Sequence, residues 1–215
     1  MPDILTFGHF QMTPAVATER KIEKTVTPEM QAQERAWAQA AQKGDSIAFM
    51  NIVDAYQRPV YNLCYRMLGE AAEAEDAAQE TFLRVYTKLD TYQHDRKFSS
   101  WLLSIASHYC IDRLRRRRYQ LVSWDDLPPG RSQPITDDPE PEEAALTRET
   151  HHSIRDLLGT LPADYRAAVI LRYWHDMSYD EIADSLETSV SAIKSRLFRA
   201  RQMMAKVAEA TELAS

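Results

Sequence analysis

The residues best suited to chemistry in this chain are cations, and they gather in two short stretches. Five arginines fall within positions 113–118, at the end of a segment rich in aromatic residues. A second group of cations lies between Glu187 and Glu209, an interval that contains no acidic residue. Arginine donates paired hydrogen bonds to phosphates and guanine edges, and aromatic rings stack on unpaired bases. Both stretches therefore favour contact with nucleic acid.

The second group belongs to a predicted helix-turn-helix over residues 177–206. Ser178, followed three residues later by Glu181, matches the capping box that opens a helix. Two apolar stripes follow at helical spacing: Ile182, Ala183 and Leu186 in the first helix, and Val190, Ile193 and Leu197 in the second. A short first helix and a cationic second helix are typical of a DNA-binding pair. An ordinary helical hairpin with a solvated basic face is the alternative that this stretch alone leaves open.

The motifs of the common enzyme classes are not found in the sequence. There is no phosphate-binding loop, no glycine-rich dinucleotide motif and no cluster of metal-ligand residues. His151 and His152 are adjacent and would point to different faces of a helix. Cys64 and Cys110 have neither zinc-ligand nor redox spacing, so we expect buried, reduced thiols. We therefore expect no enzyme activity, no catalytic residue, no metal or other cofactor, and no small-molecule substrate.

Composition is that of a soluble protein with an unexpected sign of charge for a DNA-binding protein. The 215 residues are 44% hydrophobic, and no apolar run approaches the ~18 residues that a membrane helix needs. The first residues lack the basic start and apolar block of a secretory signal, so we expect a cytoplasmic protein without direct membrane insertion. The net charge of -6 makes the distribution of charge more informative than its sum.

Turn signals and composition divide the chain into two small helical domains, and no alternating pattern predicts a strand. We predict an all-α fold whose domains are joined by a flexible, acidic, proline-rich linker, with the helix-turn-helix in the C-terminal domain. The linker holds half of the ten prolines, and seven acids against one base. The predicted boundaries are a disordered tail over 1–29, a first domain over 30–122, the linker over 123–146, a second domain over 147–210 and a tail over 211–215.

The predicted helices cover residues 34–42, 46–67 (interrupted or kinked near Pro59), 73–89, 98–118, 142–158 and 163–174, before the helix-turn-helix. In the third helix the spacing places one set of residues on the core: Ala78, Phe82, Val85 and Leu89. Its other face is polar apart from Leu83, and could be solvated or could dock a partner helix. In the fourth helix Phe98, Trp101, Leu102 and Ile105 could serve either the core or nucleic acid.

Three stretches resemble the extracytoplasmic-function (ECF) sigma factors, which consist of the region 2 and region 4 domains. They are DAAQETFLRVY, FSSWLLSIASHYCIDRLRRRR and LPADYRAAVILRYWHDMSYDEIADSLETSVSAIKSRLFRARQ. The similarity spans about residues 31–206, in the family's order and with a linker between the domains. It implies a protein that binds core RNA polymerase and directs sequence-specific transcription initiation, by recognising the −35 and −10 promoter elements and assisting promoter melting.

The resemblance also implies roles for particular residues. The face that docks on the coiled coil of the polymerase β′ subunit would be Asp76, Gln79, Glu80, Leu83 and Arg84. The −10 element would be bound by Lys97, Phe98, His108, Arg113, Arg115, Arg116 and Arg117. The −35 element would be bound by Lys194, Ser195, Arg196, Phe198, Arg199 and Arg201. His108 departs from the family pattern, in which asparagine is common in the loop that captures a flipped base. Histidine can both stack and hydrogen-bond, so the role could survive, but the resemblance leaves the preferred −10 base open.

The partners implied are core RNA polymerase, through its β′ and β subunits, promoter DNA and an anti-sigma factor. Many anti-sigma factors of the family are membrane-bound, and one of these would hold the cytoplasmic chain at the membrane. The alternative is a stand-alone helix-turn-helix regulator that binds DNA without polymerase. Residues 31–122 carry 13 basic and 11 acidic side chains, and residues 147–215 carry 9 and 10. Neither domain is strongly basic, so we expect weak promoter binding without core polymerase.

Overall fold

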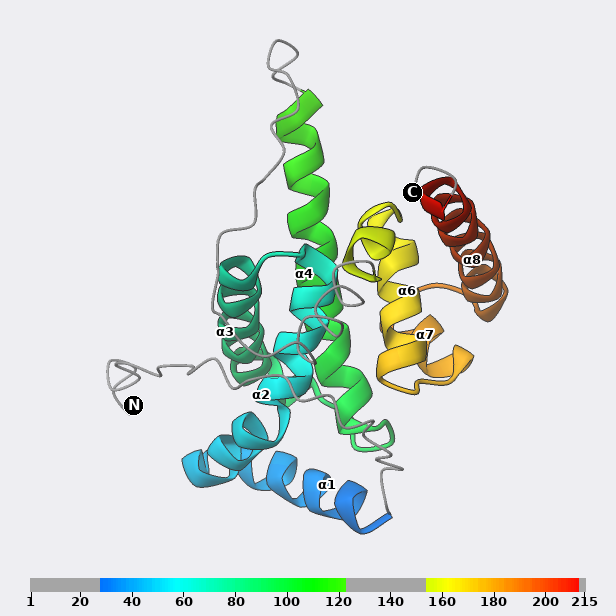
Figure 1. Cartoon of the computed structure of the whole chain (residues 1–215). Helices are drawn as coiled ribbons and strands as arrows, with labels where there is room; N and C mark the ends of the chain where they lie inside the picture. Colours follow the sequence, from blue (N-terminus) through cyan, green and yellow to red (C-terminus); the bar gives the residue numbers. More distant parts are fainter. Residues whose placement is uncertain (1–27, 123–153, 213–215) are drawn as a thin grey trace, which may run out of the picture.

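The computed structural model describes residues 28–122 and 154–212, which form two helical domains (Figure 1). Within these ranges there is no strand, which confirms the predicted all-α class. The predicted linker, most of both tails and His151 and His152 lie outside the described residues. The helices are α1 (Pro28–Gln42), α2 (Ser46–Leu68), α3 (Ala71–Lys88), the 3-10 turn η2 (Leu89–Thr91), α4 (Phe98–Val122), α6 (Ala163–Trp174), α7 (Tyr179–Ser185) and α8 (Val190–Glu212).

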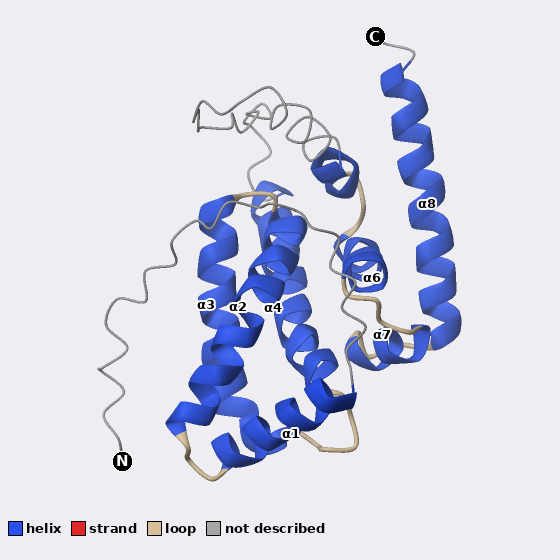
Figure 2. Cartoon of the chain, turned by 60° about the horizontal axis from the view of Figure 1, so that its bottom comes forward, coloured by secondary structure: helices blue, strands red, loops and turns tan. Residues whose placement is uncertain are grey.

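Helices α2, α3 and α4 pack side by side, and α1 crosses one end of them (Figures 1 and 2). We call α1–α4 the N-terminal bundle. Apolar residues of α2 recur every three or four positions and are buried: Ile52, Tyr56, Val60, Leu63 and Met67. They meet Leu102 and Ala106 of α4 and Ala74 and Val85 of α3 in one core. Burial of each large apolar side chain contributes about 1.5–3 kcal/mol to the free energy of folding, and this holds the three helices together.

Local signals set the ends of α2. Asp45 caps its start, because its Oδ1 accepts hydrogen bonds from the backbone N–H groups of Ile47 at 2.9 Å and Ala48 at 3.1 Å. Gly69 ends it with a φ of +83°, a left-handed conformation that glycine adopts without strain. Helix α2 runs through Pro59 without a break, so the interruption predicted as one alternative there is wrong. Burial on both sides of the proline compensates for the one backbone hydrogen bond that it removes.

The C-terminal domain contains a helical segment over 154–159, then α6, α7 and α8. The predicted capping box is confirmed, since Glu181 N–H donates to Ser178 Oγ and Ser178 N–H donates to Glu181 Oε2. The turn after α7 reverses the chain at Glu187, whose φ is +49°. Ser189 then caps α8, accepting from Ala192 N–H at 3.2 Å. The predicted apolar stripes are buried as expected at Ile182, Ala183, Leu186, Ile193 and Leu197.

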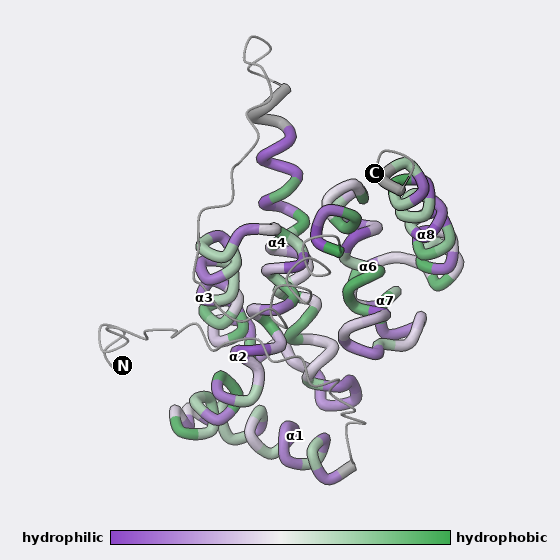
Figure 3. The backbone as a smooth tube through the Cα atoms, in the orientation of Figure 1, coloured by the Kyte–Doolittle hydropathy of each residue, from purple (hydrophilic) through white to green (hydrophobic). Residues whose placement is uncertain are grey.

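The two domains lie against each other. Helix α6 contacts α2 and α4, α7 contacts α4, and α8 lies on the far side of them from the N-terminal bundle (Figure 2). Arg166 of α6 donates to the backbone carbonyl of Met67, and the Arg66 guanidinium lies 5.0 Å from the Trp174 ring centroid. The C-terminal half of α4 is largely hydrophilic and extends beyond the bundle (Figure 3). This arrangement leaves α8 and one side of α3 exposed.

Candidate polymerase and nucleic-acid interfaces

Helix α3 separates an apolar face from a polar one as its spacing predicts. Ala78, Val85 and Leu89 are buried and Phe82 packs partly against the core, which confirms the predicted core face. On the opposite side Leu83 is 60% exposed, an unusual position for a large apolar residue on a helix that already buries a face. Around it lie the other members of the predicted docking face: Asp76, Gln79, Glu80 and Arg84.

A second exposed apolar residue, Tyr86, adjoins Leu83 one turn further along α3 and was not predicted. Tyr86 is 51% exposed, and one edge of its ring packs on Phe49 of α2 with centroids 4.9 Å apart. This contact anchors the ring while leaving most of it in solvent. The three-residue spacing from Leu83 to Tyr86 is the sequence signal that could have revealed it. Together the two residues give the polar face of α3 an apolar centre.

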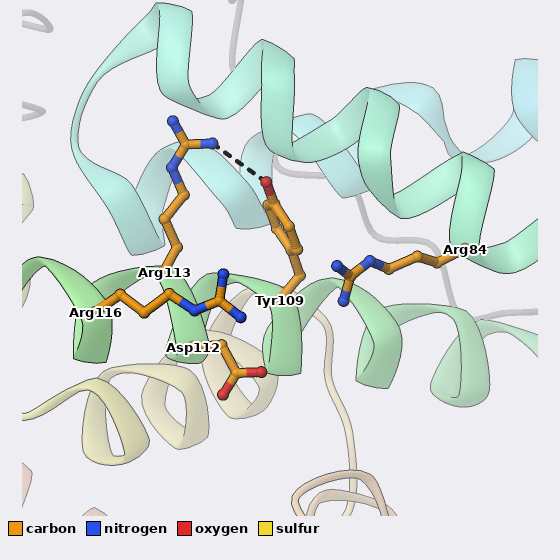
Figure 4. A pocket seen from close by; sticks show the side chains of 5 residues that line it. All are labelled: Arg84, Tyr109, Asp112, Arg113 and Arg116. Carbon is orange, nitrogen blue, oxygen red and sulfur yellow. Dashed lines mark hydrogen bonds between the residues drawn. The ribbon is translucent and has the colours of Figure 1, made fainter.

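A hollow of about 230 Å³ lies on α4 beside α3 and is lined by Arg84 of α3 and by Tyr109, Asp112, Arg113 and Arg116 of α4 (Figure 4). The Arg84 guanidinium lies 4.7 Å from the Tyr109 ring centroid and donates to Glu80 at 2.8 Å. Arg113 donates to the Tyr109 hydroxyl at 3.2 Å, and this hydrogen bond raises the pKa of Arg113. Tyr109 was not singled out from the sequence, yet it connects the predicted docking face to the arginines of α4.

Acidic residues balance part of the arginine cluster. Arg113 lies 3.9 Å from both Glu73 and Asp76, and Arg117 lies 3.4 Å from Glu73. Arg115 reaches across to the C-terminal domain, where its Nη2 donates to Asp164 at 3.0 Å. The sequence allowed either acids or phosphates to offset the repulsion between these arginines, and in the free chain acids offset part of it. Arg116 and Arg118 are exposed near the end of α4.

The start of α4 corrects one prediction. Phe98, placed among the residues expected to bind the −10 element, is only 1% exposed. Its ring lies between Tyr56, Tyr92 and Trp101, at centroid distances of 5.8, 5.1 and 5.6 Å. An aromatic residue enclosed in this way stabilises the core and leaves no ring surface for a base, so we leave Phe98 out of the candidate interface.

His108 of α4 and Lys97, the residue just before this helix, remain accessible. His108 Nδ1 lies 2.9 Å from the backbone carbonyl of Ser104, so this nitrogen donates and Nε2 is left as an acceptor. The side chain of Lys97 is 47% exposed, and its Nζ lies 2.7 Å from Glu181 of α7. Both side chains keep surface with which a base or phosphate could make contact.

Helix α8 buries Ile193, Leu197 and Ala200 and presents its cations outward. Its predicted −35 residues are exposed, except that Arg196 is half-buried: Lys194, Ser195, Arg196, Phe198, Arg199 and Arg201. Phe198 is 55% exposed in the middle of this cationic face, so core packing does not account for it. Tyr179 of α7 was not predicted; its ring centroid lies 5.2 Å from the Arg172 guanidinium and 6.0 Å from Lys194 Nζ.

Metal and membrane sites are not evident in the described part of the chain. No group of three or more potential ligands could hold a metal among residues 28–122 and 154–212. Over the same ranges no helix is long and apolar enough to cross a membrane. Cys64 and Cys110 are buried free thiols, as expected, and the hydrogen bond between them raises the pKa of Cys64.

Comparison with known proteins matches both domains to one family. The model for sigma-70 region 2 matches residues 52–119, and the model for sigma-70 region 4 matches residues 151–204. The ECF RNA polymerase sigma factor SigW of Bacillus subtilis is 40% identical over 169 residues, covering 76% of this chain and 90% of SigW. The chain belongs to the ECF sigma factors. The RNA polymerase sigma-H factor of Pseudomonas aeruginosa is 33% identical, covering 82% of this sigma factor and 94% of sigma-H.

Solved structures agree on the fold. CnrH, in complex with the cytosolic domain of CnrY, superposes with a TM-score of 0.61 at 24% identity, covering 83% of this sigma factor and 98% of CnrH. RpoE of Bartonella quintana, in complex with the anti-sigma factor NepR, gives a TM-score of 0.59 at 20% identity. The match covers 75% of this sigma factor and 96% of RpoE. At these identities the likeness shows that the sigma factor shares their helical fold.

Proposed function

We propose that this sigma factor directs core RNA polymerase to promoters through three separate surfaces on α3, α4 and α8. The α3 surface (Asp76, Gln79, Glu80, Leu83, Arg84 and the newly found Tyr86) would dock on the β′ coiled coil, with β as a second contact. A largely apolar centre within a charged rim is the composition of a protein interface with a strong central contact. Leu83, exposed on a helix that already has a buried face, is the residue that this role explains.

The α4 surface would bind the melted −10 strand through Lys97, His108, Arg113, Arg115, Arg116 and Arg117. Arginines supply phosphate contacts, and His108 offers a ring with a free Nε2 acceptor for a base that has left the stack. Binding energy gained by such bases would offset the unstacking cost of a few kcal/mol, which is how a protein without catalytic groups can assist melting. The sigma factor would thus direct an enzyme without being one.

The α8 surface would read the −35 element in duplex DNA. A helix that exposes Lys194, Arg199 and Phe198 on one side, with its other side buried, has the form of a recognition helix in the major groove. The co-occurrence of this helix with the exposed Leu83 surface in one chain is the observation that carries the proposal. A stand-alone regulator would need the recognition helix α8, but it would have no use for the exposed Leu83 surface on α3.

Partners and location follow from this role. CnrH and RpoE were each solved with a bound partner, CnrY and the anti-sigma factor NepR respectively. We extend this to the present chain and propose that an anti-sigma factor holds it inactive in the cytoplasm, where core polymerase works.

In vitro transcription tests the proposal as a whole. Core polymerase with the full-length sigma factor should start transcripts at discrete sites on genomic templates, and core alone should not. The Leu83→Glu variant should lose this activity, because a buried charge would disrupt docking, while the control Tyr173→Glu, at an exposed site of α6 outside the three surfaces, should keep it. Absence of discrete starts with the unaltered chain would refute the proposal.

A further inference from the structure

Helix α1 is tied to the connection between α3 and α4 by its last residue, Gln42. The side-chain Nε2 of Gln42 donates to the backbone carbonyls of Leu89 at 2.9 Å and Tyr92 at 3.3 Å. Because those carbonyls can only accept, the other end of the amide, Oε1, faces His94 Nε2 at 2.9 Å and accepts the hydrogen of that nitrogen. One amide group thus holds backbone and side chain that lie 47 to 52 positions further along the chain.

Residues 92–97 lead directly into α4, and we call them the entry loop. Its first residue, Tyr92, is buried, and the ring packs against Phe98 and Trp101 at centroid distances of 5.1 and 5.3 Å. The Tyr92 hydroxyl donates to the backbone carbonyl of Arg96 at 2.7 Å, which joins the two ends of the loop. The entry loop is therefore closed from within by its own tyrosine and held from outside by α1.

The rest of the entry loop is open to solvent. Gln93, Asp95, Arg96 and Lys97 are all exposed, and Lys97 belongs to the proposed −10 surface. Figures 1 and 2 show α1 across the end of the bundle at which α4 begins, so α1 lies next to this part of that surface. The loop is thus anchored through one set of residues and free to make contacts through another.

Anchoring of the entry loop lowers the cost of binding a single strand. A loop without side-chain anchors samples many backbone conformations, and ordering it on a ligand costs conformational entropy. His94 is hydrogen-bonded through one nitrogen, since its Nδ1 is buried without a partner in the described structure. Loss of the Gln42 amide would therefore free the His94 ring from α1 and leave two loop carbonyls without this donor. The entry loop would then have to be ordered when DNA binds.

We propose that Gln42 is a positioning residue for promoter opening, which holds the entry loop in the conformation that receives the melted −10 strand. The inference rests on the proposed role of Lys97 and α4 at the −10 element. Gln42 acts through Leu89, Tyr92 and His94, and makes none of the DNA contacts itself. Because the α3 and α8 surfaces do not depend on this amide, its removal impairs capture of the single strand and leaves docking and −35 binding intact.

The test uses holoenzyme assembled from core polymerase and the full-length sigma factor. The probe is a labelled single-stranded oligonucleotide that carries the nontemplate −10 sequence of a promoter located by transcription in vitro. Fluorescence anisotropy should show about tenfold weaker binding for Gln42→Ala than for the unaltered chain. The matched control is Gln39→Ala, an exposed glutamine on the same helix, which should bind as the unaltered chain does. Equal affinities of Gln42→Ala and Gln39→Ala would overturn the proposal.

A second variant separates positioning from general stability. Asp45→Ala removes the cap of α2 three residues after Gln42, and so destabilises the same corner of the bundle without removing a contact to the entry loop. Urea denaturation gives the loss of stability for each variant. Asp45→Ala should bind the single strand as the unaltered chain does. If both variants weaken binding in proportion to their loss of stability, Gln42 acts on the fold alone and the proposal is wrong.

A duplex probe that carries only the −35 element completes the comparison. Its affinity for the holoenzyme should be the same with Gln42→Ala and with the unaltered chain. An equal loss on the duplex and on the single strand would also overturn the proposal. Failure of the proposed function would look different, because the unaltered holoenzyme itself would then bind neither probe specifically and would start no transcripts.

Discussion

The Arg84 guanidinium lies over the Tyr109 ring, 4.7 Å from its centroid, and this contact joins the proposed docking helix α3 to the proposed −10 helix α4. Arg84 is fixed from its other side by Glu80 at 2.8 Å, and Tyr109 is fixed by Arg113 at 3.2 Å. A cation over an aromatic face contributes about 0.5–1 kcal/mol at an accessible site. The two functional faces of the N-terminal bundle are thus mechanically connected.

Replacement of Tyr109 tests this connection. Tyr109→Ala removes both the ring under Arg84 and the acceptor of Arg113, so we expect the free energy of unfolding to fall by about 1–2 kcal/mol. Tyr109→Phe keeps the ring and loses one hydrogen bond, so the free energy of unfolding should fall by less than about 1 kcal/mol. Urea denaturation followed by circular dichroism measures both. Equal losses in the two variants would mean that the ring over which Arg84 lies adds nothing.

Leu83→Ala tests the docking face. Because Leu83 is 60% exposed, its truncation should change the free energy of unfolding by less than about 0.5 kcal/mol. Affinity for core polymerase should nevertheless fall at least tenfold, since a central apolar contact of an interface contributes more than about 1.4 kcal/mol. Competition against a labelled sigma factor measures the affinity. Tyr173→Ala, at an exposed site on α6, is the control, and a loss of similar size there would argue against a localised interface.

Arg199→Ala tests base reading by α8. If Arg199 reads a guanine, the variant loses about 1–3 kcal/mol of binding at a cognate −35 element and discriminates less at that one position. Binding of the holoenzyme to promoters altered one base at a time measures this. Lys206→Ala, an exposed cation further along α8, should leave discrimination intact. A loss that is uniform across all sequences would assign Arg199 to phosphate contact only.

His175 makes stability depend on pH in a defined direction. Only part of this side chain is exposed, and its Nε2 is buried without a hydrogen-bond partner in the described structure. Burial, with the nearby positive charge of Arg66, lowers the pKa of His175 from 6.5 to about 4. The unfolded chain therefore takes up a proton first, so this contribution to stability is fully present above pH 6.5 and is lost as pH falls to about 4.

The loss attributable to His175 should be on the order of 3 kcal/mol across that interval. Urea unfolding at a series of pH values gives the slope of the free energy of unfolding against pH. It is measured for the unaltered chain and for His175→Gln, in which the side chain at position 175 cannot titrate. The slope between pH 6.5 and 4 should be smaller in the variant. Parallel slopes would show that the pKa of His175 in the folded chain stays near its ordinary value.

The elements best predicted from the sequence are those set by local signals. The helix-turn-helix follows from the capping box at Ser178 and from apolar spacing, both of which act within a few residues. The outward cations of α8 follow from the absence of acids between Glu187 and Glu209. These features need no knowledge of distant parts of the chain.

Contacts between distant residues were beyond prediction. The sequence gives no means of pairing Arg115 with Asp164, 49 positions away, because one solvated acid is much like another before the domains are placed. The residue type and spacing of Phe98 suit either core packing or contact with DNA. Only its packing against Tyr56 and Tyr92 in the structure shows that it belongs to the core. Pro59 carries a helix-breaking signal, yet the packing of α2 on both sides overrides it.

Equilibrium binding to one promoter fragment, measured with and without core polymerase, tests the central claim most directly. The fragment is chosen from the start sites found by transcription in vitro, and the full-length sigma factor is titrated at fixed salt. Holding both domains on one rigid enzyme should tighten binding on the order of a hundredfold or more relative to the free chain. Equal affinity of the free chain and the holoenzyme would contradict the account and favour a stand-alone regulator.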